Sequence, residues 1–192
     1  MNAFLLALGV VFLAELGDKS QLMALAFAAR YRALTVLVAV SIATLLVHAG
    51  SVLLGRVFAL ALPTNVILVV AGLAFFGFAA WTLRGDKLGE QEEERAQQTG
   101  RWALVTIGTA FFLAELGDKT MLATMALATT EEPIGTWLGS TVGMVAADAI
   151  AIAIGALLGA RLPERAIKVL AAGAFVVFGV LLVAEGLGLL PR

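Results

Sequence analysis

The segment Phe12–Lys19, FLAELGDK, places two acids and a lysine inside an otherwise apolar stretch. The same eight residues recur unchanged at Phe112–Lys119. The offset of 100 residues continues outside this segment, because Leu62-Pro63 matches Leu162-Pro163. Charged residues are costly in apolar segments, so chance does not explain two identical copies. The chain consists of two copies of one unit.

Composition indicates an integral membrane protein. Of the 192 residues, 61% are hydrophobic and 14% are charged, and the mean hydropathy is +0.99, far from ordinary globular usage. The sequence shows no basic footprint of the kind that binds nucleic acid. It has no cysteine, which excludes disulfides, thiolate metal sites and cysteine nucleophiles.

The apolar segments predict an all-α polytopic membrane protein with six transmembrane helices. A bilayer core about 30 Å thick needs roughly 20 apolar residues of helix. Such segments lie near residues 3–28, 34–59, 65–83, 102–128, 134–158 and 166–189. Three helices per copy force the second copy to enter the bilayer from the opposite side, which gives two inverted three-helix repeats. We expect the first repeat at 1–84, a cytoplasmic linker at 85–100 and the second repeat at 101–192.

Positive charge between the segments predicts the orientation. Lys and Arg in short loops stay on the cytoplasmic side. Outside the motifs, the side with the loops after the first, third and fifth helices carries nine such residues: Arg30, Arg32, Arg84, Lys87, Arg95, Arg101, Arg161, Arg165 and Lys168. The other side carries Arg56 and Arg192. Both termini are therefore predicted on the non-cytoplasmic face. The central segment, with four glutamates between Glu90 and Glu94, is interpreted as a solvated linker rather than a cation-gathering entrance.

The repeated motif supplies charges that must avoid lipid. A carboxylate near the bilayer centre costs about 2.5–3.5 kcal/mol. On a continuous helix, Glu15, Asp18 and Lys19 would share one face, as would their counterparts Glu115, Asp118 and Lys119. If the copies pack about a pseudo-two-fold axis, four carboxylates and two ammonium groups meet at one midplane site.

Charge balance at such a site favours cation/proton exchange. Four ionised acids and two lysines leave −2, which one divalent cation or two protons would neutralise. Oxygen ligands suit Ca²⁺, Mg²⁺ or Mn²⁺, carried as cargo with no resident cofactor. The predicted metal ligands are the motif acids Glu15, Asp18, Glu115 and Asp118, and the candidate neutral ligands are Ser20, Thr120 and Gln21. Gln21 has Met121 as its counterpart, and Met121 is expected to serve in packing.

Gly17 and Gly117 precede the two aspartates, and two roles stay open for them. Each could loosen the helix and expose carbonyl groups, with the aspartate capping the next segment. Each could instead allow close helix packing.

Polar residues elsewhere predict a second layer around the site. Ser41, Thr44, His48 and Ser51 recur at spacings of three and four, and Ser140, Thr141 and Asp148 follow at the matching place in the second copy. We expect Ser41, Thr44 and Thr141 to bond to helix backbone. His48 could relay protons or make an ordinary hydrogen bond between helices. The predicted second layer or proton relay comprises Lys19, Lys119, His48, Asp148 and Thr44.

Two other interpretations of the motif are weaker. Lysine–carboxylate pairs that merely hold helices together would account for one acid per lysine and leave two acids over. Intramembrane aspartyl proteases use a G-x-G-D motif, but Glu15 stands where that motif has its first glycine. We therefore predict no enzymatic activity.

The doubled E-x-G-D-[KR]-[ST] motif resembles that of the Golgi calcium/manganese transporter family and its bacterial manganese-exporter branch. The resemblance implies export of Mn²⁺ or Ca²⁺ in exchange for protons, by alternating access, with Glu15, Asp18, Glu115 and Asp118 as ion ligands. The short linker and the lack of an N-terminal extension favour a bacterial inner-membrane protein and Mn²⁺. The alternatives are a passive divalent-cation channel and an exporter of cationic amino acids, which the motif lysines would repel.

Overall fold

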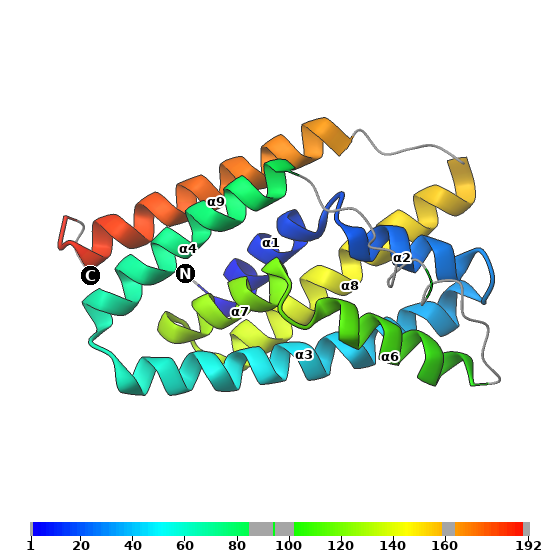
Figure 1. The fold of residues 1–192 in the computed structure, drawn as a ribbon, viewed down its shortest axis with the longest axis horizontal. Coiled ribbons are helices and arrows are strands. Elements are labelled where there is room, and N and C mark those ends of the chain that lie inside the picture. The colour runs from blue at the N-terminus through cyan, green and yellow to red at the C-terminus, as the bar shows by residue number, and fades with distance from the viewer. Residues whose placement is uncertain (1, 85–93, 95–101, 159–163, 190–192) are drawn as a thin grey trace.

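The computed structural model describes residues 2–84, 94, 102–158 and 164–189, so the predicted linker lies outside the described residues except for Glu94. The described residues form eight α-helices and no strand (Figure 1). The helices are α1 (Ala3–Glu15), α2 (Lys19–Ala28), α3 (Ala33–Ala61), α4 (Thr64–Arg84), α6 (Ala103–Glu115), α7 (Lys119–Thr130), α8 (Pro133–Leu158) and α9 (Glu164–Gly186).

Four helices are long and apolar enough to cross a membrane: α3, α4, Pro133–Ala153 within α8 and Lys168–Gly186 within α9. The helices α1 and α6 are apolar but have only 13 residues each. The prediction of an all-helical membrane protein is confirmed. The segments predicted at 3–28 and 102–128 are each divided at the motif into a pair of helices, α1–α2 and α6–α7.

A glycine in left-handed conformation makes each break. Gly17 has φ 76° and Gly117 has φ 78°, values that cost other L-residues about 1–2 kcal/mol. The first helix of each pair ends at Glu15 or Glu115, and the aspartate that follows the glycine is the N-cap of the next helix. Of the two roles open from the sequence, the structure shows the helix break.

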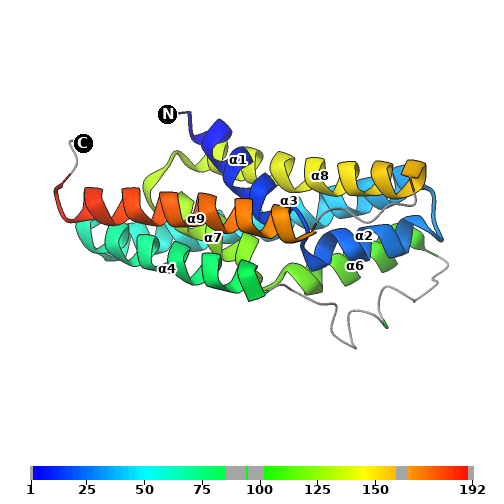
Figure 2. The same ribbon diagram turned by 90° about the horizontal axis from the view of Figure 1, so that it is seen from above.

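The two halves of the chain interlock. The helix α1 packs along α8, α6 packs along α3, and α4 pairs with α9 (Figures 1 and 2). Where α3 crosses α8, the Thr44 hydroxyl donates to Met144 Sδ at 3.4 Å. These residues are 100 positions apart, so the crossing lies near the axis that relates the two copies. Each half therefore completes its packing only against the other.

Small residues permit the closest approaches. A Cβ atom at Gly143 of α8 would lie 3.1 Å from the Phe12 backbone nitrogen of α1, and one at Gly72 of α4 would lie 2.8 Å from the Gly179 carbonyl oxygen of α9. Close backbone approach of this kind is typical of helices that associate in membranes. Large apolar side chains cover the outside instead, including Leu34, Leu53, Leu60, Val105, Ile134 and Leu189.

The buried apolar side chains form two clusters. One joins α2, α3 and α6, with Phe27 and Phe111 among its largest members. The other joins α1, α4, α7 and α9 around Phe75 and Phe175, whose ring centroids lie 5.7 Å apart. The two helix breaks lie between these clusters, where α1 meets α2 and α6 meets α7 (Figure 1).

Candidate ion-binding site

The two motifs meet through reciprocal ion pairs. Lys119 Nζ lies 2.6 Å from Asp18 Oδ1, and Lys19 Nζ lies 3.4 Å from Asp118 Oδ1. The Lys119–Asp18 pair is almost completely buried, whereas the Lys19 side chain is 16% exposed. The predicted meeting of the two motifs is thus observed. The geometric reason given for it, one face of a continuous helix, is wrong, because the break turns each aspartate and lysine toward the opposite copy.

The motif glutamates are the buried acids that these pairs leave over. Glu15 is 0% exposed and Glu115 is 1% exposed. Thr120 Oγ1 donates to Glu115 Oε2 at 3.1 Å. Within the described residues, neither carboxylate oxygen of Glu15 has a hydrogen-bond partner, and the buried hydroxyl of Ser20 has none either. Interhelical pairing therefore explains the aspartates of the motif but not the glutamates.

Asp148 of α8 joins the motif acids. It is 0% exposed, and neither of its carboxylate oxygens has a hydrogen-bond partner in the part of the chain that the structure describes. It interacts electrostatically with Asp18, Glu15 and Glu115. If ionised, these acids and Asp118 carry five negative charges against the two lysines, which leaves −3 rather than the −2 expected from the motifs alone.

His48, the counterpart of Asp148, lies in a different environment. Its Nδ1 atom is 3.4 Å from the Thr141 hydroxyl oxygen, and the side chain is 1% exposed. This contact links α3 to α8. It agrees with one of the two roles considered from the sequence, an ordinary hydrogen bond between helices. A role of His48 in proton transfer stays a prediction.

The carboxylates are not assembled around a metal-sized centre in this state. Among the described residues, no group of three or more Asp, Glu or His side chains is positioned to hold a metal ion. The lysine ammonium groups instead lie against the aspartates. Ligation by Glu15, Asp18, Glu115 and Asp118 stays a prediction.

The side chain four positions after each glycine accepts a hydrogen bond from the glycine N–H, but this side chain differs between the two breaks. Gly17 N donates to Gln21 Oε1 at 2.8 Å, while Gln21 Nε2 donates to the Ala147 carbonyl of α8 at 2.9 Å. Gly117 N donates to Met121 Sδ at 3.1 Å. Gln21 therefore ties the first break to α8, and its amide oxygen is engaged in this state. Sequence reasoning treated Met121 as packing and missed its contact with the turn.

Hydroxyl side chains near the site divide into two groups. Ser41 donates to the Leu37 carbonyl at 2.7 Å and Thr141 to the Trp137 carbonyl at 2.8 Å, which confirms the expected backbone bonding. For Thr44 that expectation is wrong, because it donates to Met144 Sδ. Two buried hydroxyls, those of Thr124 and Ser140, have no hydrogen-bond partner within the described residues. Thr124 was overlooked, although it lies one helical turn after Thr120.

Comparison with known proteins finds one family model and several relatives that are similar to most of this chain. The sequence model of the family described as "Divalent cation/proton antiporter GDT1" matches residues 3–90 and 103–189. A Vibrio cholerae protein named "Putative manganese exporter" is 35% identical over 91% of this chain and 87% of its own length. Protein PAM71 from Arabidopsis thaliana chloroplasts is 34% identical over 96% of this chain, and a chloroplast GDT1-like protein 2 from rice is 31% identical over 93%.

The chain spans 56% of the Arabidopsis protein and 60% of the rice protein. No solved structure matches it. The family match covers both copies of the motif and nearly all described helices, and the family consists of cation transporters rather than enzymes. The chain therefore belongs to the GDT1 family of divalent cation/proton antiporters.

Proposed function

We propose that this chain exports Mn²⁺ from the cytosol in exchange for protons, by alternating access to a site at the two helix breaks. One observation carries the proposal. Glu15 is fully buried, neither of its oxygens is hydrogen-bonded within the described residues, and it interacts electrostatically with Glu115, Asp148 and the Lys119–Asp18 pair. Buried carboxyl groups in a membrane must carry protons or share a cation. The same group can therefore bind either exchange partner, but not both at once.

The proposed path through the bilayer has six crossings. The pairs α1–α2 and α6–α7 each cross as one broken helix, which gives repeats at 1–84 and 101–192 joined by a linker at 85–100. The two ranges matched by the family, 3–90 and 103–189, support this division. The excess of Lys and Arg supports termini outside and a cytoplasmic linker, in a bacterial inner membrane.

The proposed exchange begins with the lysines. A cytosolic divalent cation competes with Lys119 and Lys19 for Asp18 and Asp118, and the released carboxylates gather around the cation with Glu15 and Glu115. One divalent cation and one proton balance the net charge of −3 when the acids are ionised. On the opposite side, protons bind the carboxylates and weaken their hold on the cation. The lysines then pair with the aspartates again, and the protein returns the protonated site to the cytosolic side.

The chemistry of the donors supports a hard or borderline ion. Carboxylates and the motif hydroxyls of Ser20 and Thr120 supply oxygen, which suits Mn²⁺ and Ca²⁺. We favour Mn²⁺, in line with the name of the Vibrio relative.

Flux into proteoliposomes tests the proposal. Mn²⁺ and Ca²⁺ movement is measured with and without an imposed pH gradient, for the native chain and for Glu15→Gln. Glu185→Gln, at the end of α9 and away from the motifs, is the matched control. We expect uphill Mn²⁺ movement that requires the gradient, is lost in Glu15→Gln and persists in Glu185→Gln, with equal melting temperatures. Downhill flux alone would indicate a channel, and Glu15→Gln that melts early would indicate a structural motif.

A further inference from the structure

The packing of the two halves is unequal although their sequences repeat. The helix α4 packs on α7, and α9 packs on α1. The equivalent contacts under the offset of 100 residues would be α9 on α2 and α4 on α6. Neither contact reaches a comparable extent among the described residues. The α4–α9 pair therefore packs against α1 and α7 rather than against α2 and α6 (Figures 1 and 2).

Side-chain exposure follows this inequality at positions where the two copies have the same residue. Leu22 of α2 is 43% exposed, whereas Leu122 of α7 is partly buried. Lys19 is 16% exposed against 3% for Lys119. Phe78 of α4 is buried, but Phe178 of α9 is only partly buried. Because the side chains are identical, the difference arises from what packs against them.

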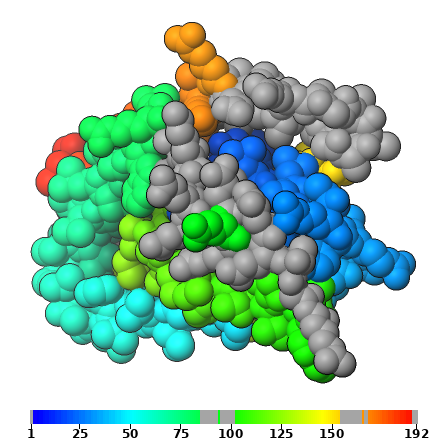
Figure 3. Space-filling model, turned by 45° about the vertical axis from the view of Figure 1, so that its right-hand side comes forward, coloured from blue at the N-terminus to red at the C-terminus, as the bar shows by residue number. Residues whose placement is uncertain are grey.

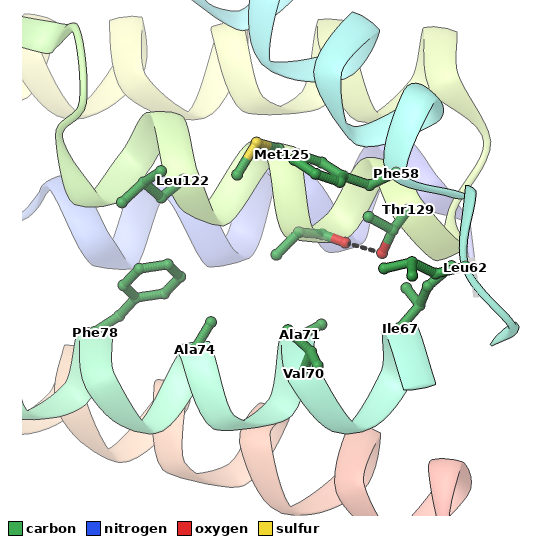
Figure 4. A pocket seen from close by; sticks show the side chains of 11 residues that line it. Phe58, Leu62, Ile67, Val70, Ala71, Ala74, Phe78, Leu122, Met125 and Thr129 are labelled. Atoms are coloured by element: carbon green, nitrogen blue, oxygen red, sulfur yellow. Dashed lines mark hydrogen bonds between the residues drawn. The ribbon is translucent and has the colours of Figure 1, made fainter. Parts of the chain in front are cut away.

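The contact between α4 and α7 is built from repeated residues. It encloses an apolar groove of about 350 Å³ between α4, α7 and the end of α3 (Figure 4). Six of its lining residues have an identical counterpart on α9 or α2: Ile67, Ala71, Ala74, Phe78, Leu122 and Ala126 correspond to Ile167, Ala171, Ala174, Phe178, Leu22 and Ala26. The faces of α2 and α9 thus carry the residues of an interface that this state does not form.

We propose that the two repeats exchange these packing arrangements, so that a second state closes α9 on α2 and releases α4 from α7. The proposal rests on alternating access as the proposed function. Inverted repeats permit it, because swapping their conformations generates a state that opens toward the other side. The ion pairs exchange as well, with Lys19–Asp118 becoming the short, buried pair and Lys119–Asp18 the longer one.

The present state is then closed where the chain begins and where α3 turns into α4. Its opposite end carries α2 and the start of α6, both visible in Figure 3, and neither α4 nor α9 packs on these two helices to a comparable extent among the described residues. That end also bears Arg30 and Arg32, between α2 and α3, which the charge bias places toward the cytoplasm. The structure would thus correspond to the state that receives cytosolic metal.

Disulfide trapping tests the second state, and the chain has no native cysteine to interfere. The variant Leu122→Cys with Ala74→Cys reports the contact present here. Its repeat equivalent, Leu22→Cys with Ala174→Cys, reports the predicted contact. The matched control is Leu22→Cys with Val177→Cys, because Val177 lies on the outer side of α9 and is 57% exposed. Each variant is oxidised in proteoliposomes, and both cross-link yield and Mn²⁺ flux are measured before and after reduction.

We expect both repeat-related pairs to cross-link well above the control, with flux lost on oxidation and restored by reduction. Added Mn²⁺ and an imposed proton gradient should shift the yields of the two pairs in opposite directions. If Leu22→Cys with Ala174→Cys cross-links no better than the control while the unoxidised variant still transports Mn²⁺, the exchange of packing is refuted and the proposed function stands. If both pairs cross-link but no metal moves in the native chain, the second state stands and the proposed function fails.

Discussion

Replacing Gly117 by alanine should destabilise the protein through backbone conformation alone. Gly117 has φ 78°, and an ideal Cβ placed on it meets no atom within 4 Å. The substitution therefore creates no clash, and its cost is the left-handed penalty of about 1–2 kcal/mol. For a chain of this size, each kcal/mol lowers the melting temperature by about 2–4 °C. Gly117→Ala should therefore melt several degrees below the native protein.

Gly77 supplies a control, because replacing it by alanine should change the melting temperature in the opposite direction. Gly77 lies within α4, is exposed, and also has no atom within 4 Å of an added Cβ. Alanine is favoured over glycine inside a helix by about 0.5–1 kcal/mol, so Gly77→Ala should melt at or slightly above the native temperature. Gly117→Asn should fall between the native protein and Gly117→Ala, because asparagine tolerates left-handed backbone. Thermal unfolding of the purified proteins in one detergent provides the measurement. Equal melting of Gly117→Ala and Gly77→Ala would refute the helix break at this position.

Four further substitutions probe contacts of the site and of the helices that carry it. Lys119→Met should lower the free energy of unfolding by about 3–5 kcal/mol, because it removes the ion-pair partner of the buried Asp18. Lys19→Met should lower it less, because that lysine is 16% exposed and its ion pair is longer. Equal melting temperatures of the two variants would contradict this difference. Gln21→Met places at the first break the residue found at the second break. It should lower the free energy of unfolding by about 0.5–1.5 kcal/mol, because the hydrogen bond to α8 is lost. An unchanged melting temperature would argue that this hydrogen bond does not stabilise the fold. Gly139→Ala should cost about 1–3 kcal/mol by pressing a methyl group onto the α1 backbone, 3.0 Å from Phe4 Cα, and native-like melting would show that the α1–α8 contact is looser than described.

The repeat made much of the architecture predictable. An identical motif at an offset of 100 residues required two equivalent units, and apolar segment lengths gave the helices α3, α4, α8 and α9. The helix breaks could not be derived, because a glycine before an aspartate is compatible with a continuous helix or a turn. Both glycines adopt the same left-handed φ although the residue four positions later is Gln21 in one copy and Met121 in the other, so no single side chain in the local pattern marks the break.

The composition of the site was predictable, but its pairing was not. Acids and lysines repeated in an apolar chain had to face each other, but their spacing did not specify which lysine pairs with which acid. The structure joins Lys119 to Asp18 instead, because the break redirects both side chains. The approach of Asp148 to the motif acids depends on the register between α8 and α1, which no local pattern encodes.

The reciprocal ion pairs also set an order for biogenesis. Asp18 and Lys119 are separated by 101 residues in the chain, so the first half emerges from the ribosome and enters the bilayer before its partner charge has been synthesised. Until then Asp18 and Lys19 each carry a cost of about 2.5–3.5 kcal/mol near the bilayer centre. Assembly of the second half against the first supplies the partner charges that remove this cost. A chain truncated before Phe112 would be retained or degraded rather than accumulate as a half-size transporter.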